Sequence, residues 1–141
     1  MSTTIEEIIA VEFVNREKNI INFVKDETMH GFFHFNPTVI KPRIGDVFKV
    51  KFEKSKDNKF YKTISIRPAE PDVICPAIRA FNGKIEIANK NGFGFVEDIF
   101  IFPQMVKKMG LINGQEVVGR AVLSFDKKKS TWGWTVFKLI L

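Results

Sequence analysis

The chain has 141 residues, of which 45% are hydrophobic and 27% are charged, and its net charge is +6. This balance predicts a folded chain, because it supplies enough apolar side chains for a core and too few charge blocks for disorder. No run approaches the roughly 18 apolar residues of a membrane helix, and the start, residues 1–7, is acidic where a signal peptide is basic. We therefore expect a cytoplasmic protein without a membrane partner.

Disulfide and metal chemistry are not expected. Cys75 is the single cysteine of the chain, so it cannot form an internal disulfide, and His30 and His34 alone cannot supply a zinc-ligand spacing. We predict no metal and no cofactor, and we interpret Cys75 as a small core or linker residue.

The positive charge and the aromatic content bear on the kind of partner. A surplus of Lys and Arg favours a polyanion, although a merely soluble surface explains a charge of +6 equally well. The fifteen Phe, two Trp and one Tyr are more informative, since flat rings either fill a core or lie beneath unstacked bases. The positions of the rings along the strands must decide between these uses.

Alternation of apolar and polar residues predicts five strands in the first half of the chain. Four of them are Val11–Val14, Ile20–Val24, Val47–Phe52 and Tyr61–Ile66, and the third in chain order carries Phe32, Phe33, His34 and Phe35. Thr4–Glu7 is a candidate helical turn before the first of them. Pro68, Pro71 and Pro76 then interrupt the pattern, because proline cannot donate to a strand ladder. We interpret residues 69–77 as a linker.

The strand pattern resumes at Ile78 and again gives five short strands. They are Lys84–Ile87, Phe93–Val96, Ile99–Phe102, Glu116–Val122 and Trp134–Leu139. Met105–Met109 is predicted to form a helical turn between the third and fourth of these strands.

The order of the loops also recurs in the two halves. In each, the third strand runs into a proline, a long basic connection follows, a glycine opens the fourth strand, and a charged hairpin precedes the fifth. The corresponding residues are Pro37, Gly45 and the hairpin Lys54–Lys59, then Pro103, Gly114 and the hairpin Asp126–Ser130. Such a match predicts a duplicated unit. The fold class is therefore all-β, with two tandem five-stranded OB-type barrels at residues 1–68 and 78–141.

Aromatic residues gather on particular strands of this scheme. Alternation places Phe93 and Phe95 on one face of their strand and Phe100 and Phe102 in another row. The glycines beside Phe93 and Phe95 favour binding over core packing, since they would let a nucleotide lie flat against the strand. In the first half, Phe33 and Phe35 alternate with Phe32 and His34, so one pair must face the barrel interior and the other must face outward.

These segments resemble the motifs of the cold-shock domain. Lys84–Val96 is similar to its first ribonucleoprotein motif, and Asp98–Phe102 is similar to its second. Gly31–Phe35 resembles the second motif more closely, and Phe13–Asn15 resembles the Trp-Phe-Asn of the first strand. The resemblance covers nearly the whole chain twice, and it implies base-stacking roles for one set of residues in each half. They are Phe93, Phe95, Phe100 and Phe102 in the second, and Phe13, Phe32, His34 and Phe35 in the first.

The chain departs from the family pattern at several of these positions. Ile87 and Ala88 stand where the family has Trp and Phe, and Phe102 stands in place of its His. The first half offers Ile21–Val24 in place of the Gly-Phe-Gly-Phe core. Each half therefore keeps one motif well and the other poorly.

Basic side chains lie close to the aromatic motifs in sequence and are candidates for phosphate contacts. They are Lys84, Lys90 and Lys107 in the second half, and Lys18, Lys25 and Lys41 in the first. The run Lys127–Lys129 is better explained as a solvated hairpin tip. Trp132 and Trp134 fit either an extra stacking surface or a packing pair.

No enzyme motif occurs in the sequence. There is no phosphate-cradling Gly-Lys-Ser/Thr loop and no nucleophile elbow, and the adjacent Glu97 and Asp98 are expected to face opposite ways. The predicted function is therefore low-specificity binding of single-stranded RNA or DNA, through stacking and phosphate neutralisation, as in cold-shock RNA chaperones and regulators. The alternative is an OB-type protein-interaction module that serves a larger nucleic-acid complex.

Overall fold

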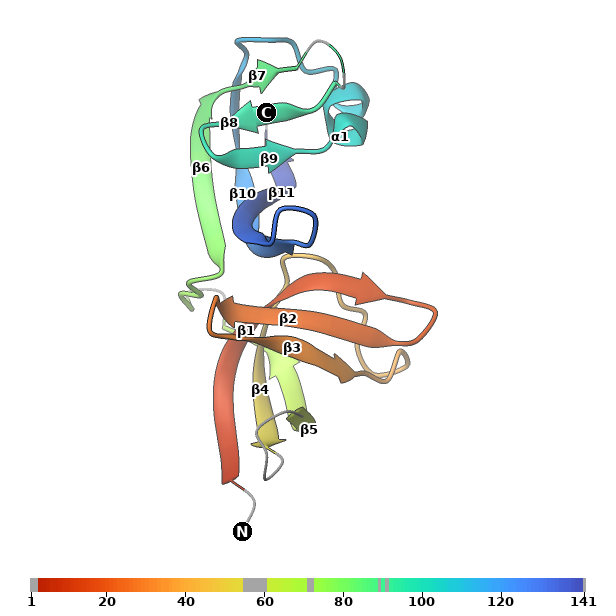
Figure 1. The fold of residues 1–141 in the computed structure, drawn as a ribbon. Helices are drawn as coiled ribbons and strands as arrows, with labels where there is room; N and C mark the ends of the chain where they lie inside the picture. The colour runs from red at the N-terminus through yellow and green to blue at the C-terminus, as the bar shows by residue number, and fades with distance from the viewer. Residues whose placement is uncertain (1–2, 55–60, 71–72, 89, 91, 141) are drawn as a thin grey trace. The chain divides into compact units, whose positions relative to one another are not determined.

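A computed structural model describes residues 3–54, 61–70, 73–88, 90 and 92–140 of the chain (Figure 1). Residues 1–77 and 78–141 form two compact units. Strands dominate both units, and the described residues include one short helix, in the second unit. The all-β prediction is therefore confirmed.

The first unit is a five-stranded barrel. Its strands are β1 (Thr3–Asn15), β2 (Ile20–Asp26), β3 (Met29–His34), β4 (Val47–Lys54) and β5 (Tyr61–Pro68). They are ordered β3-β2-β1-β4-β5, and β3 and β5 at the two ends of this order contact each other. Strand β1 is long enough to pair with β4 through its first half and with β2 through its second, which lets the sheet curl on itself.

The inward faces of these strands make the core of the first unit. Phe23, Phe33 and Phe52 lie within it, with ring centroids 5.1 to 5.7 Å apart, and Ile9 and Val50 are fully buried beside them. Each such side chain contributes about 1.5–3 kcal/mol by leaving water. Phe33 is thus the inward member of the adjacent phenylalanines on β3.

The second unit has the same connectivity and adds a helix. Its elements are β6 (Ile78–Lys84), β7 (Glu86–Ile87), β8 (Gly94–Val96), β9 (Ile99–Ile101), α1 (Pro103–Lys108), β10 (Glu116–Asp126) and β11 (Thr131–Ile140). The strand order is β6-β10-β11-β9-β8-β7. The first and last strands of this order, β6 and β7, are separated in sequence by one residue, the buried Ile85. They are therefore two parts of one bent strand, and this strand closes the sheet into a barrel.

The pairing confirms OB-type connectivity in the second unit. Strand β11 pairs in parallel with β9, with Trp134 opposite Ile99, while the other ladders are antiparallel. In both units the third strand pairs with the second. Figure 1 shows β7, β8 and β9 stacked as neighbours, with α1 at one end of the row.

Helix α1 forms where a helical turn was predicted. Pro103 occupies its first turn, where a missing N–H costs nothing, and Lys107 and Lys108 lie in its last turn, where cations are favoured. Val106 is its buried residue.

Some sequence predictions about elements were wrong. Thr4–Glu7 lies within β1 and pairs with β4, so it forms no helical turn. The expected strand Lys84–Ile87 is only the bent end of a longer strand that begins at Ile78. The expected hairpin at residues 54–59 falls mostly outside the described residues.

The stretch between the barrels is partly packed. The Ala69 N–H donates to the Val47 carbonyl, and Cys75 and Ala77, which belong to the first unit, are buried. Burial raises the pKa of the Cys75 thiol, so it stays neutral and behaves as a small apolar residue.

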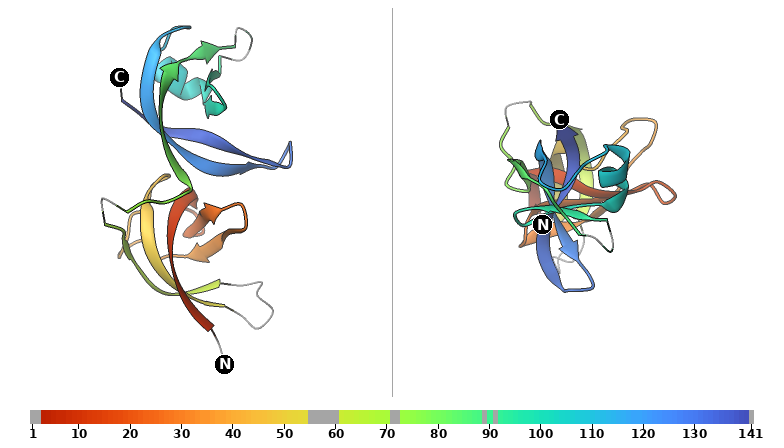
Figure 2. Two further views of the ribbon diagram at one scale, coloured as in Figure 1. Left: turned by 90° about the vertical axis from the view of Figure 1, so that its left-hand side faces the viewer. Right: turned by 90° about the horizontal axis from the view of Figure 1, so that it is seen from above.

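The hairpin of β10 and β11 is the longest in the second unit (Figure 2). In its turn, Asp126 Oδ1 accepts hydrogen bonds from the N–H groups of Lys128 and Lys129. The exposed run Lys127–Lys129 therefore occupies a defined turn at the hairpin tip.

Candidate nucleic-acid interface

The outer face of β8 and β9 carries four phenylalanines, Phe93, Phe95, Phe100 and Phe102, which we term the ring cluster. On β8, Gly94 and Val96 are buried while Phe95 is exposed, and on β9 the buried Ile99 and Ile101 flank Phe100. The strand register sets Phe95 opposite Phe100. Alternation therefore turns Phe95 and Phe100 away from the core, and Phe93 and Phe102 follow just beyond the strand ends. Phe93 and Phe100 are half-buried.

The four rings form one continuous surface. The Phe93 centroid lies 5.3 Å from that of Phe95 and 5.6 Å from that of Phe100, and Phe100 lies 5.2 Å from Phe102. Phe95 is 36% exposed and Phe102 is 47% exposed. The two rows expected from the sequence are thus brought together in a single patch, with edge-on and tilted contacts between rings.

The glycines beside these rings have structural reasons for being glycine. A Cβ on Gly94 would lie 2.6 Å from Ile85 Cδ1 inside the barrel, so this position is small because the bent strand packs against it. Gly92 adopts φ +71° in the loop before β8, a conformation that favours glycine. The inference that the glycine makes room for a nucleotide was therefore wrong for Gly94, whose missing side chain faces the barrel interior.

Positive charge is concentrated in the unit that carries the ring cluster. Residues 78–141 include ten Lys and Arg against five Asp and Glu, whereas residues 1–77 include twelve against eleven. The net charges are therefore +5 and +1. Lys84, Lys90 and Lys107 are all exposed, and Lys90 lies in the loop that leads into Phe93.

Glu97 and Asp98 converge on one partner. Arg79 Nη1 lies 2.9 Å from an Asp98 carboxylate oxygen, and Arg79 Nη2 lies 3.5 Å from one of Glu97. Glu97 has φ +55° in the turn between β8 and β9, so the alternation of an extended strand does not apply there. The expectation that these two carboxylates face opposite ways was wrong.

The two tryptophans of β11 have different surroundings. Trp134 is half-buried against the second core, and the Arg79 guanidinium lies 5.7 Å from its ring centre. Trp132 pairs instead with Phe125 on the neighbouring strand, at a centroid distance of 5.4 Å. Trp134 is therefore a packing residue, while Trp132 packs within the hairpin of β10 and β11.

The first unit carries a smaller aromatic row. Phe13 on β1 pairs with Asn22 on β2, which pairs with Phe32 on β3, so these three side chains line up across the sheet. Phe13 and Phe32 are 50% and 53% exposed. His34, two residues after Phe32 on β3, is also exposed. We call Phe13, Phe32 and His34 the first-unit row.

The other first-unit candidates, Phe35 and Lys18, have different surroundings. Phe35 is half-buried and packs against the first core with Phe33, so it is placed less well than Phe32 to meet a base. Lys18 is exposed in the turn between β1 and β2, and its N–H donates to Asn15 Oδ1.

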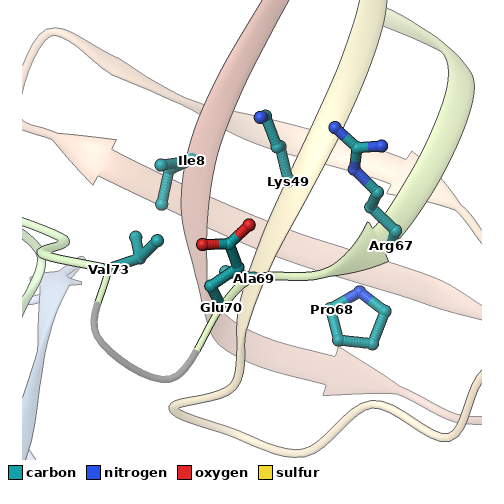
Figure 3. A pocket seen from close by; sticks show the side chains of 7 residues that line it. All are labelled: Ile8, Lys49, Arg67, Pro68, Ala69, Glu70 and Val73. Carbon is teal, nitrogen blue, oxygen red and sulfur yellow. The ribbon is translucent and has the colours of Figure 1, made fainter.

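A charged hollow of about 320 Å³ lies over β1, β4 and β5, and Figure 3 shows its lining. Lys49, Arg67 and Glu70 are the charged residues among those that line it. Glu6 lies 3.0 Å from Lys49 Nζ and 3.7 Å from Arg67, and the hydrogen bond from Lys49 lowers the pKa of Glu6. The opposite charges balance, so this hollow is a poor candidate for phosphate.

A groove beside the ring cluster was not anticipated from the sequence. It lies between α1 and β11, has a volume of about 510 Å³, and is walled by Phe102, Met105, Met109, Phe137 and Leu139. Phe137 is half-buried and lies at the irregularity of β11 between Val136 and Lys138. Nothing in the local pattern indicates that this ring meets helix α1.

No group of three or more His, Cys, Asp or Glu side chains lies close enough to hold a metal ion in the part of the chain that the structure describes. No described helix has the length and apolar character to cross a membrane.

Comparison with protein families agrees with the fold. Residues 1–64 match the S1/CSD-like domain 1 of the TOTE conflict systems, where CSD denotes a cold-shock domain, and residues 79–139 match domain 2 of the same systems. No curated protein and no solved structure matches the chain. The two matches fall in order on the two barrels, so the chain belongs to the tandem S1/CSD-like proteins of the TOTE conflict systems, a divergent form of tandem cold-shock domain.

Proposed function

We propose that this protein binds single-stranded RNA or DNA, chiefly through the ring cluster of its second unit. The observation that carries the proposal is the cluster itself, in which four rings are linked by successive contacts and Phe95 and Phe102 are exposed. Soluble proteins rarely leave such a contiguous apolar patch uncovered unless it meets a partner. An S1/CSD-like fold within a conflict system is consistent with a nucleic-acid partner.

Stacking and charge would act together in this binding. A base laid on an exposed ring gains about 1–3 kcal/mol, with little regard for which base it is, because every base has a flat π face. The surplus charge of +5 in the second unit would neutralise phosphates along the strand. The result would be low sequence specificity and marked salt dependence.

The first-unit row would act as a second and weaker surface. It presents two exposed rings and a histidine, but they belong to a unit whose net charge is only +1. We propose no chemical reaction at either surface, since the sequence contains no nucleophile, phosphate-loop or metal-ligand motif. We also propose a cytoplasmic location, on the ground that the single cysteine leaves no internal disulfide.

Truncation of the exposed rings tests the proposal. Phe95→Ala and Phe102→Ala are each expected to weaken binding of a short single-stranded oligonucleotide by about 1–3 kcal/mol, since each removes a stacking surface. Thermal unfolding should change little, because both rings already face water. Fluorescence titration and thermal melts on the same preparations give the two quantities.

Phe125→Ala is the matched control for these variants. Phe125 is 42% exposed but lies on the hairpin of β10 and β11, where it contacts Trp132 outside the ring cluster. A well-folded Phe95→Ala, Phe102→Ala double variant that binds oligonucleotides as the unaltered protein does would reject the ring cluster as a nucleic-acid surface. The same exposed apolar rings would then favour the alternative, a protein-interaction module in a larger nucleic-acid complex.

A further inference from the structure

We propose that the groove between α1 and β11 receives one further base of the same strand that lies on the ring cluster. This inference rests on the proposed function and extends the path of the strand beyond β8 and β9. It assigns to the groove an occupant of defined chemistry, a nucleobase with its flanking phosphates.

The groove is continuous with the ring cluster. Phe102 belongs to both, since it contacts Phe100 at 5.2 Å and also forms one wall of the groove. Phe137 lies on the opposite wall of the groove, at the irregularity of β11 between Val136 and Lys138. Both rings line the same groove, so a strand that leaves the ring cluster over Phe102 meets Phe137 next.

The apolar walls suit the faces of a base. Met105 and Met109 come from α1, and Leu139 comes from β11. Methionine is flexible and polarisable, so it adapts to flat surfaces of different outline and makes favourable sulfur–aromatic contacts. A groove of about 510 Å³ falls in the size range of small-molecule sites.

The polar side chains at the groove favour an anionic strand over an apolar peptide. Lys108 and Lys138 line it and are exposed, and no acidic side chain lines it among the described residues. Two cations suit the phosphates on either side of a seated base. Gln104 adds an amide that can both donate to and accept from a base edge.

Phe137→Ala in the full chain tests this assignment, because it removes a groove wall that lies outside the ring cluster. Binding is measured with oligothymidylates of about two to eight nucleotides, a range that spans the shorter sites known for a single OB fold. We expect affinity to rise with length in the unaltered protein until the groove is filled. In Phe137→Ala the short oligomers should bind as before, while the longer ones should lose about tenfold in affinity.

A second measurement reads the groove directly. With ¹³C-labelled methionine methyl groups, the resonances of Met105 and Met109 should shift with long oligomers and stay in place with short ones. Ile112→Ala is the control, since Ile112 is 68% exposed in a loop outside the groove. It should leave the length dependence unchanged.

The outcomes separate this inference from the function on which it rests. If oligomers of every length bind, Phe95→Ala weakens them, and neither Phe137→Ala nor the methionine resonances respond, the groove assignment is wrong and the ring cluster stands. If no oligomer binds, both proposals fail. Groove resonances that respond only to an apolar peptide would likewise overturn the assignment of a base.

Discussion

Gly94 illustrates how one residue of a recognisable motif can serve packing. It stands between Phe93 and Phe95, where a binding motif would place a glycine for access to the ligand, yet its missing side chain faces Ile85 inside the barrel. The outward exposure of Phe95 follows from the alternation of the same strand. The sequence alone does not reveal the reason for this glycine, which is its contact with Ile85 at the bend between β6 and β7.

We expect Gly94→Ala to destabilise the second unit by about 1–3 kcal/mol, because the added Cβ would lie 2.6 Å from Ile85 Cδ1 in a packed core. Thermal or denaturant unfolding measures this loss. Gly133→Ala is the matched control, since a Cβ there meets nothing within 4 Å. If Gly94→Ala proved as stable as the unaltered protein but lost oligonucleotide binding, a direct role of Gly94 at the ligand would be restored.

For the adjacent Phe32 and Phe33 of β3, the sequence pattern does not decide which ring is buried. Alternation requires that Phe32 and Phe33 face opposite ways, but it does not say which of them faces the core. The structure turns Phe33 inward, where it contacts Phe23 and Phe52, and leaves Phe32 exposed. The deciding factor is the closure of the barrel, which depends on strands far apart in the chain.

At the scale of the element, the turn between β2 and β3 is organised by Asp26. Its Oδ1 accepts hydrogen bonds from the Thr28 N–H at 2.8 Å, the Thr28 hydroxyl at 2.7 Å and the Met29 N–H at 2.8 Å. These bonds favour the charged carboxylate, and the hydrogen bond from the Thr28 hydroxyl is the chief cause of a lowered pKa for Asp26. The turn thus holds β3, with Phe32, in register on β2.

The lowered pKa gives the stability of the first unit a pH dependence. A depressed folded-state pKa contributes stability above the ordinary aspartate value, about 3.9, and that contribution is lost as the pH falls through the folded value. Asp26→Asn should therefore lower stability at neutral pH and flatten the acid dependence. Denaturant unfolding between about pH 7 and pH 3 measures both effects. An acid limb unchanged by Asp26→Asn would show that Asp26 contributes no stability.

Element boundaries were predicted best where the strand pattern was regular. The predicted strands Ile20–Val24 and Ile99–Phe102 match β2 and β9 closely. Helix α1 overlaps the helical turn predicted at Met105–Met109. The error at Thr4–Glu7 has a physical cause, since Ile5, Ile8 and Ile9 have the spacing of a helix face. Antiparallel pairing with β4 overrides that local preference.

At the scale of the molecule, the sequence predicted two barrels because the strand count and the loop order recur. The recurrence of strands and loops did not indicate that the two units differ in net charge, which is +5 on the second and +1 on the first. Nor did it predict the merging of two phenylalanine rows into one patch, which depends on the register between β8 and β9. The two units are therefore expected to contribute unequally to binding, with the second dominant.

Oligonucleotide titration of the full chain over a series of salt concentrations tests this account most directly. The proteins to compare are the unaltered chain, a Phe95→Ala, Phe102→Ala variant, and a Phe13→Ala, Phe32→Ala variant. We expect affinity to fall linearly with salt on a log-log plot, with a slope that reports a few phosphate contacts. The second-unit variant should lose most of the affinity and the first-unit variant little. An affinity indifferent to salt, or a well-folded second-unit variant that binds as tightly as the unaltered chain, would contradict the account.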